Sequence, residues 1–124
     1  MVNETRILLV EDDSSIRDFL SLALTDEGFL VATADNGWVG LTKVTSFQPD
    51  LIILDMNLPI ISGQDFIAVY AGLPQSAPVI GISAMRNGKE IAERAGIMDF
   101  LEKPFSLDDL FAHIAQYLPS RNDV

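Results

Sequence analysis

Acidic side chains stand directly after two short apolar runs of the sequence. Glu11 and Asp12 follow residues 7–10, and Asp55 follows residues 51–54, which read Leu-Ile-Ile-Leu. Carboxylates that crowd together repel one another, and a hard divalent cation with oxygen ligands relieves this repulsion. The residue types therefore predict a Mg²⁺ site, provided that the fold brings the ends of the two runs together.

A hydroxyl and an ammonium group end two further runs. Ser83 follows residues 79–82, and Lys103 stands directly before Pro104. A carboxylate such as Asp55 can act as a nucleophile and form an aspartyl-phosphate. A metal ion and a lysine would neutralise charge on the transferring phosphoryl group, and the hydroxyl would hold a phosphate oxygen. No second acid–base residue stands beside the nucleophile, so the set suits acceptance of a phosphoryl group better than turnover of a substrate.

Short apolar runs alternate with helical periodicity along the chain, which predicts an α/β fold. Short apolar runs bounded by turn signals are typical of strands buried on both faces, and their alternation with helices favours a five-stranded parallel sheet with helices on both faces. The carboxyl ends of such strands share one edge, where the polar residues would meet. The strands are expected at residues 7–10, 29–34, 51–55, 79–83 and 99–103, and the helices at 14–28, 38–47, 66–70, 91–95 and 107–118. Gly28 is expected to close the first helix as its C-cap residue.

Size and charge limit the classes of function. The 124 residues suffice for one domain with a core, so a single domain is expected over 1–124, with flexible ends at 1–5 and 120–124. The net charge of −10 argues against direct binding of nucleic acid or of an anionic membrane surface. There is no Cys, which excludes disulfides and thiolate metal sites and is compatible with a cytoplasmic location. No apolar run is long enough to span a bilayer.

Taken in order, these motifs resemble the receiver domain of two-component response regulators. The resemblance covers nearly the whole chain and implies the flavodoxin-like, CheY-like (βα)5 receiver fold. Each motif alone is weak, and their specificity comes from their order and their place at strand ends. The motifs are Val10-Glu11-Asp12-Asp13, Leu54-Asp55-Met56-Asn57-Leu58-Pro59, Gly63, Ser83-Ala84 and Lys103-Pro104-Phe105.

The resemblance assigns roles to the acidic residues. Asp55 would be the phosphoacceptor in a Mg²⁺-dependent reaction. Glu11 and Asp12 would be the acidic pair, with Asp12 the more direct ligand and Glu11 acting largely through water. The backbone carbonyl of Asn57 would complete the metal site.

The resemblance also implies a switch and its partners. Ser83 would be the switch hydroxyl, Lys103 the phosphate contact with a cis bond to Pro104, and Phe100 the switch aromatic, where many relatives have Tyr. A sensor histidine kinase or a histidine phosphotransfer protein would donate the phosphoryl group. The face made by the fourth helix, fifth strand and fifth helix would then bind a downstream protein or a second copy of the chain. Such a domain is a signalling switch that catalyses only its own phosphorylation and dephosphorylation.

Three other functions fit parts of the pattern. A haloacid-dehalogenase-like phosphohydrolase also uses an aspartyl-phosphate, but it needs an acid two residues after the nucleophile, where this chain has Asn57. A flavodoxin-like cofactor binder would need a phosphate-cradling loop after the first strand, where Glu11 and Asp12 would repel phosphate. A receiver that docks with partners without being phosphorylated is the third alternative, against which the intact set of site residues argues.

Three residues are expected to have structural rather than chemical roles. Asp13 is interpreted as the cap of the first helix. His113, the only His, is expected on the polar surface of the last helix. Trp38 is interpreted as a packing residue rather than a platform for a ligand.

Overall fold

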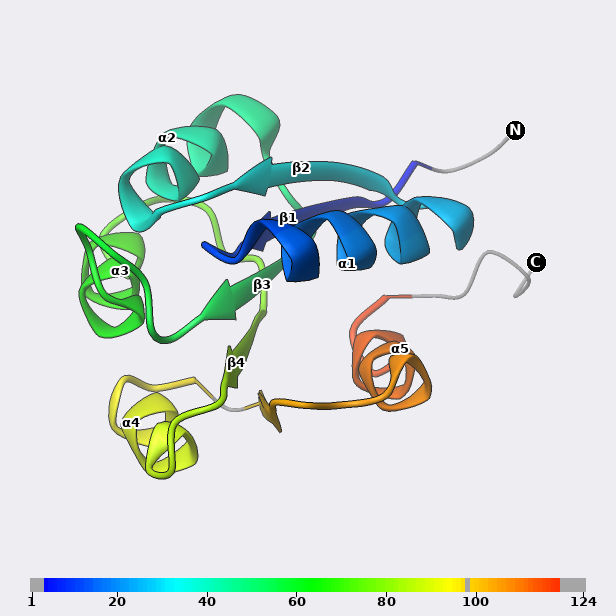
Figure 1. Cartoon of the computed structure of the whole chain (residues 1–124). Coiled ribbons are helices and arrows are strands. Elements are labelled where there is room, and N and C mark those ends of the chain that lie inside the picture. Colours follow the sequence, from blue (N-terminus) through cyan, green and yellow to red (C-terminus); the bar gives the residue numbers. More distant parts are fainter. Residues whose placement is uncertain (1–3, 98, 119–124) are drawn as a thin grey trace.

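Five parallel strands form one sheet in the computed structural model, which describes residues 4–97 and 99–118 (Figure 1). The order across the sheet is β2-β1-β3-β4-β5, with all neighbouring pairs parallel. This confirms the predicted α/β fold. The strands are β1 (Arg6–Val10), β2 (Leu30–Ala34), β3 (Leu51–Asp55), β4 (Val79–Ser83) and β5 (Asp99–Glu102).

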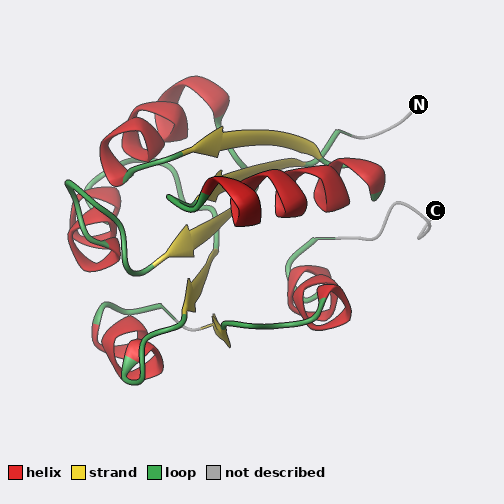
Figure 2. Ribbon diagram, in the orientation of Figure 1, coloured by secondary structure: helices red, strands yellow, loops and turns green. Residues whose placement is uncertain are grey.

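Helices cover both faces of the sheet, as the alternating pattern predicted (Figure 2). The core on one face includes Leu20 of α1 and Leu110 of α5, whereas the core on the other face includes Val44 of α2, Phe66 of α3 and Ala92 of α4. The helices are α1 (Ser14–Asp26), α2 (Gly37–Phe47), α3 (Gly63–Tyr70), α4 (Gly88–Arg94) and α5 (Leu107–Ala115).

The central strand β3 joins the two cores. Ile53 belongs to the core under α1 and α5, while its neighbours Ile52 and Leu54 belong to the opposite core. Successive side chains of a strand point to opposite faces, so an apolar run without alternation fits a strand covered on both sides. Full burial of each such side chain contributes about 2 kcal/mol. This packing fixes the position of Asp55, the last residue of the strand.

Side-chain caps begin four of the helices. The Asp13 carboxylate accepts a hydrogen bond from the Ile16 backbone N–H at 3.0 Å, so the interpretation of Asp13 as the cap of α1 is confirmed. Asn36, Ser62 and Ser106 cap α2, α3 and α5 in the same way. Each cap satisfies an amide that the first helical turn leaves without a partner.

The predicted bounds of α1 and β2 were wrong by one or two residues. Strand β2 begins at Leu30 rather than Phe29, and α1 ends at Asp26, before Gly28. Gly28 has a φ of 97°, and the Phe29 amide donates back to the Leu24 carbonyl at 3.2 Å. Gly28 therefore closes α1 as predicted, and Phe29 is part of the turn that ends the helix.

Other bounds also differ from the prediction. Strand β5 ends at Glu102, although the Lys103 amide still donates to the Ser83 carbonyl at 2.9 Å, and the Lys103–Pro104 bond is cis as expected. The α-helical part of α5 ends at Ala115, earlier than predicted. Of the expected flexible ends 1–5 and 120–124, residues 1–3 and 120–124 lie outside the described residues, and the single-domain boundary remains a prediction.

Candidate functional site

The strand register brings the predicted site residues to one edge of the sheet. Val10 of β1 pairs with Leu54 of β3, so Glu11 emerges beside Asp55. On the other side Asp55 pairs with Ile82, the residue before Ser83 of β4. Parallel strands end on the same side, which explains how residues distant in sequence meet here.

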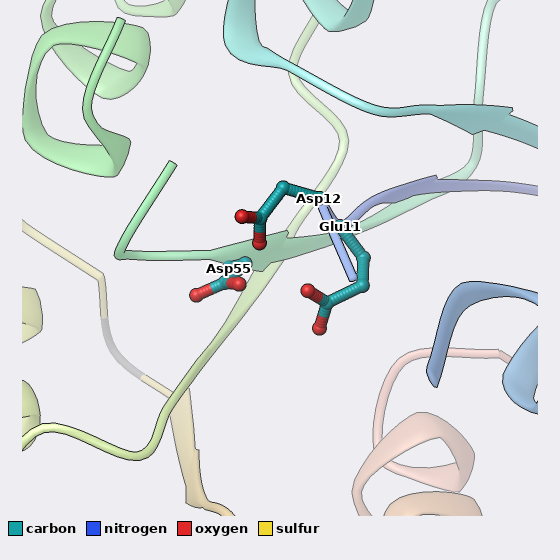
Figure 3. A group of neighbouring side chains, drawn as sticks. All are labelled: Glu11, Asp12 and Asp55. Atoms are coloured by element: carbon teal, nitrogen blue, oxygen red, sulfur yellow. The ribbon is translucent and has the colours of Figure 1, made fainter. Parts of the chain in front are cut away.

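Three carboxylates converge at this edge. Figure 3 shows the side chains of Glu11 and Asp12 turned toward Asp55, and the three groups each offer an oxygen within 4.8 Å of the others. Glu11 is fully buried and Asp55 is 3% exposed, whereas Asp12 is open to solvent. These side chains line a cleft of about 400 Å³, whose other lining residues include Asn57, Met85 and Lys103.

Lys103 supplies a positive charge inside the carboxylate cluster. Its Nζ lies 2.6 Å from Oε1 of Glu11 and 3.2 Å from Oδ2 of Asp55. The lysine side chain is only 15% exposed, so water screens these ion pairs weakly. One ammonium group thus holds two buried carboxylates that come from two other strand ends.

Burial and charge shift two pKa values in the cluster. Burial, followed by the contact with the Asp55 carboxyl, raises the pKa of Glu11 to about 7 despite the opposing effect of Lys103. Burial lowers the pKa of Lys103, but its contacts with Glu11 and Asp55 outweigh this and raise the pKa overall. Lys103 therefore stays charged near neutral pH, while Glu11 can gain or lose a proton there.

Backbone groups fix the orientation of the acidic side chains. The Asn57 amide donates to Oδ1 of Asp55 at 2.9 Å, and the Asp13 amide donates to Oε2 of Glu11 at 3.1 Å. Arg17 of α1 donates from Nη1 to the Glu11 carbonyl at 3.0 Å and to the Asp12 carbonyl at 3.3 Å. The sequence analysis missed Arg17, because a single arginine in a helix carries no motif that would mark it.

The predicted switch residues lie next to this cleft. Ser83 is fully buried, and its Oγ accepts a hydrogen bond from the Met85 amide at 3.0 Å. Phe100 is half-buried and packs against the core under α4. The Phe100 ring is thus neither fully buried nor fully exposed in this structure.

The acidic cluster can accept a divalent cation with oxygen ligands. Oxygens bound directly to one Mg²⁺ at about 2.1 Å are separated by at most about 4.2 Å. The observed limit of 4.8 Å is slightly wider, so a small inward movement or one bridging water would suffice. The donor set contains only oxygen, the ligand type that Mg²⁺ prefers, and the residues present therefore fit this ion.

Comparisons with known proteins decide the family. The family model described as "Response regulator receiver domain" matches residues 7–115. The chain belongs to this family. It is a receiver domain of two-component systems, a class of phosphoacceptor signalling switches that interact with histidine kinases or phosphotransfer proteins.

Individual relatives agree with this assignment. The response regulator ArlR of Staphylococcus aureus is 40% identical over 116 residues, which are 92% of this chain and 52% of the relative. The transcriptional regulatory protein PrrA of Mycobacterium tuberculosis is 34% identical over 97% of this chain and 52% of its own length. The receiver domain thus spans about half the length of these relatives. The chemotaxis protein CheY4 of Vibrio cholerae superposes with a TM-score of 0.85 at 28% identity, covering 94% of this chain and all of CheY4.

Two residues outside the cleft correct or refine the expectations. His113 was predicted to be a surface residue and is partly exposed, but its Nδ1 lies 2.5 Å from Oδ1 of the buried Asp99, a contact that was not predicted. The carboxylate comes from the start of β5, so helical periodicity alone could not reveal this pair. Trp38 is 66% exposed near the start of α2.

No helix within residues 4–97 and 99–118 is long and apolar enough to cross a membrane.

Proposed function

We propose that this receiver domain accepts a phosphoryl group on Asp55 in a Mg²⁺-dependent reaction. The donor would be a sensor histidine kinase or a histidine phosphotransfer protein. One observation carries the proposal: Lys103 Nζ contacts both Asp55 and Glu11, at the edge where Asp12 adds a third carboxylate. A nucleophile, a metal-ligating acidic pair and a phosphate-binding cation then lie in one cleft.

The residues of the cleft have distinct roles in this reaction. An oxygen of Asp55 attacks the donor phosphorus, an acyl phosphate O–P bond forms, and the P–N bond to the donor imidazole breaks. Lys103 neutralises charge on the phosphoryl oxygens. Glu11, Asp12, Asp55 and the Asn57 carbonyl would hold Mg²⁺, which supplies further charge neutralisation when it is bound. In the dephosphorylation reaction, water attacks the phosphorus, the same O–P bond breaks and inorganic phosphate leaves, without a separate enzyme.

The phosphoryl group would change the surface through β4 and β5. A phosphoryl oxygen on Asp55 attracts the Ser83 hydroxyl by a charge-assisted hydrogen bond. Phe100, now half-buried, would then move inward and alter the face formed by α4, β5 and α5. Burial of the remaining ring area would stabilise the active arrangement by up to ~1 kcal/mol. A downstream protein or a second copy of this chain would bind that face.

The alternative functions have less support. Asn57 cannot supply the proton that a haloacid-dehalogenase-like hydrolase needs from that position, and Glu11 and Asp12 occupy the loop where a flavodoxin-like protein would cradle phosphate. A receiver that is never phosphorylated would not need Lys103 between Glu11 and Asp55. The buried ion pairs therefore favour a working phosphoacceptor site.

Phosphorylation by a small donor tests the proposal directly. The protein is incubated with acetyl phosphate, with Mg²⁺ or with EDTA, and intact mass is measured. Wild type is expected to gain one phosphoryl group only with Mg²⁺, and Asp55→Asn is expected to gain none. Asp65→Asn, at an exposed position in the first turn of α3, is the matched control and should be labelled as wild type is. Labelling of Asp55→Asn, or labelling that survives EDTA, would show that the site is wrongly assigned.

A further inference from the structure

The first residue of α4 touches the side chain of Ser83. A Cβ added to Gly88 would lie 2.7 Å from Ser83 Cβ and 2.8 Å from Ser83 Oγ. Real Cβ atoms do not approach other atoms this closely, so only glycine permits this contact. The two residues are also buried, Ser83 completely. Helix α4 therefore begins directly against the hydroxyl that the proposed switch uses.

Hydrogen bonds join the same two residues through Met85. The Met85 amide donates to Ser83 Oγ at 3.0 Å, and the Gly88 amide donates to the Met85 carbonyl at 3.0 Å. Asn87, which precedes the helix, provides no side-chain cap. The turn that starts α4 is thus attached to Ser83 both by packing and by this short chain of hydrogen bonds.

The ring of Phe100 reaches the same small volume. Its Cζ would lie 3.1 Å from a Cβ at position 88. Three groups therefore border the same small volume: the Ser83 side chain, the Gly88 backbone and the ring tip of Phe100. If the Ser83 hydroxyl turns toward Asp55, this space opens, and the α4 turn and the ring can both move into it.

We propose that Gly88 is the positioning residue through which the Ser83 side chain sets the position of the first turn of α4. This inference rests on the proposed function, because it describes how phosphorylation of Asp55 would reach the surface. The missing Cβ allows the helix backbone to respond to the rotamer of Ser83. A side chain at position 88 would hold the turn away from Ser83 in both states and so remove the response.

Backbone amide NMR with Mg²⁺ and beryllofluoride, a phosphoryl mimic, tests this coupling. In wild type we expect shifts at residues 56–58 and at residues 89–92. Gly88→Ala is expected to keep the first set and lose the second, and to show altered resonances at 89–92 before beryllofluoride is added. The control is Gly72→Ala, whose new Cβ would meet only the Val69 carbonyl at 3.5 Å, and it should respond as wild type does.

The outcomes separate this inference from the proposed function. No shift at residues 56–58 in wild type would overturn the phosphoacceptor site and the coupling together. Wild-type shifts at 89–92 that persist in Gly88→Ala would overturn the coupling alone. Should Gly88→Ala fail to fold, the double variant Ser83→Gly/Gly88→Ala removes the two Ser83 atoms at 2.7 and 2.8 Å, leaves the milder contact with Phe100 Cζ at 3.1 Å, and is expected to fold. A double variant as unstable as the single one would show that the contact is not the cause, and would also overturn the proposal.

Discussion

Replacing Lys103 by Met tests how the buried charges of the cleft are balanced. Methionine keeps most of the length and apolar contacts of the lysine side chain but removes its charge. The Glu11 and Asp55 carboxylates then lose the ammonium group that lies 2.6 and 3.2 Å from them. Removing one partner of a buried ion pair costs about 3–5 kcal/mol when the other group remains charged. Glu11 can avoid part of this cost by binding a proton, since its pKa is already raised to about 7.

The pH dependence gives the expected magnitude. A raised folded-state pKa means that native Glu11 binds more protons than unfolded Glu11 between pH 4.5 and 7, so the unfolding free energy falls as pH rises through this window. In Lys103→Met the folded-state pKa of Glu11 rises further. If folded Glu11 then stays protonated from pH 6 to pH 8 while unfolded Glu11 is ionised, the unfolding free energy falls by ~2.7 kcal/mol over this interval. Wild-type Glu11 titrates within that interval and loses about half as much. The difference between variant and wild type should therefore grow by ~1 kcal/mol from pH 6 to 8.

Urea denaturation with EDTA present at pH 6, 7 and 8 measures this difference. Lys89→Met, which replaces an exposed lysine of α4, controls for the loss of a positive charge elsewhere. The double variant Lys103→Met/Glu11→Gln should lose the extra pH dependence, because it has no Glu11 proton to exchange. A stability difference that stays constant or shrinks as pH rises would refute this account of the charge balance.

Three further variants address residues in and around the cleft. Arg17→Gln should weaken Mg²⁺ binding about 10-fold in calorimetric titrations, because the Arg17 guanidinium binds the backbone carbonyls of Glu11 and Asp12. An unchanged Mg²⁺ affinity would contradict this role. Asn57→Leu, at an exposed position, should alter the decay rate of the acyl phosphate while stability stays within about 0.5 kcal/mol, and lost stability with unchanged decay would make Asn57 structural. Gly63→Ala should lower the unfolding free energy measured in urea by ~1–3 kcal/mol, because the new Cβ would lie 2.6 Å from Met56 Cα. A loss of stability no larger than that of Gly72→Ala would argue against this clash.

The fold and the composition of the cleft could be predicted from local patterns. Strand β3 reads as an unbroken apolar run because both of its faces are covered, and α5 shows clear helical periodicity because only one of its faces is. Once the strands are parallel, their polar ends must share an edge. That requirement places Glu11, Asp55 and Lys103 on one edge, and the strand order, with β1 beside β3 and β5 next to β4, then brings them into contact.

Close contacts between distant elements could not be predicted in this way. Arg17 binds backbone carbonyls, which every residue has, so no residue type in the β1–α1 loop marks the interaction. The approach of Gly88 to Ser83 depends on where a short helix begins, and the pair of Asp99 with His113 depends on how α5 lies against β5. Periodicity identifies the face of a helix but not the atoms that this face meets.

Charge balance would connect Mg²⁺ binding to the proposed phosphorylation of Asp55 in this cleft. When ionised, the three carboxylates and Lys103 carry a net charge of −2, because three negative groups face one positive group. One divalent cation neutralises this charge, but a phosphoryl group on Asp55 then adds negative charge. Lys103 is the cation already in place to meet it, and its positive charge would then be shared between the Glu11 carboxylate and the phosphoryl oxygens. Phosphorylation should therefore weaken the Lys103–Glu11 ion pair, and the Mg²⁺ ion becomes the main counter-charge of the acidic pair.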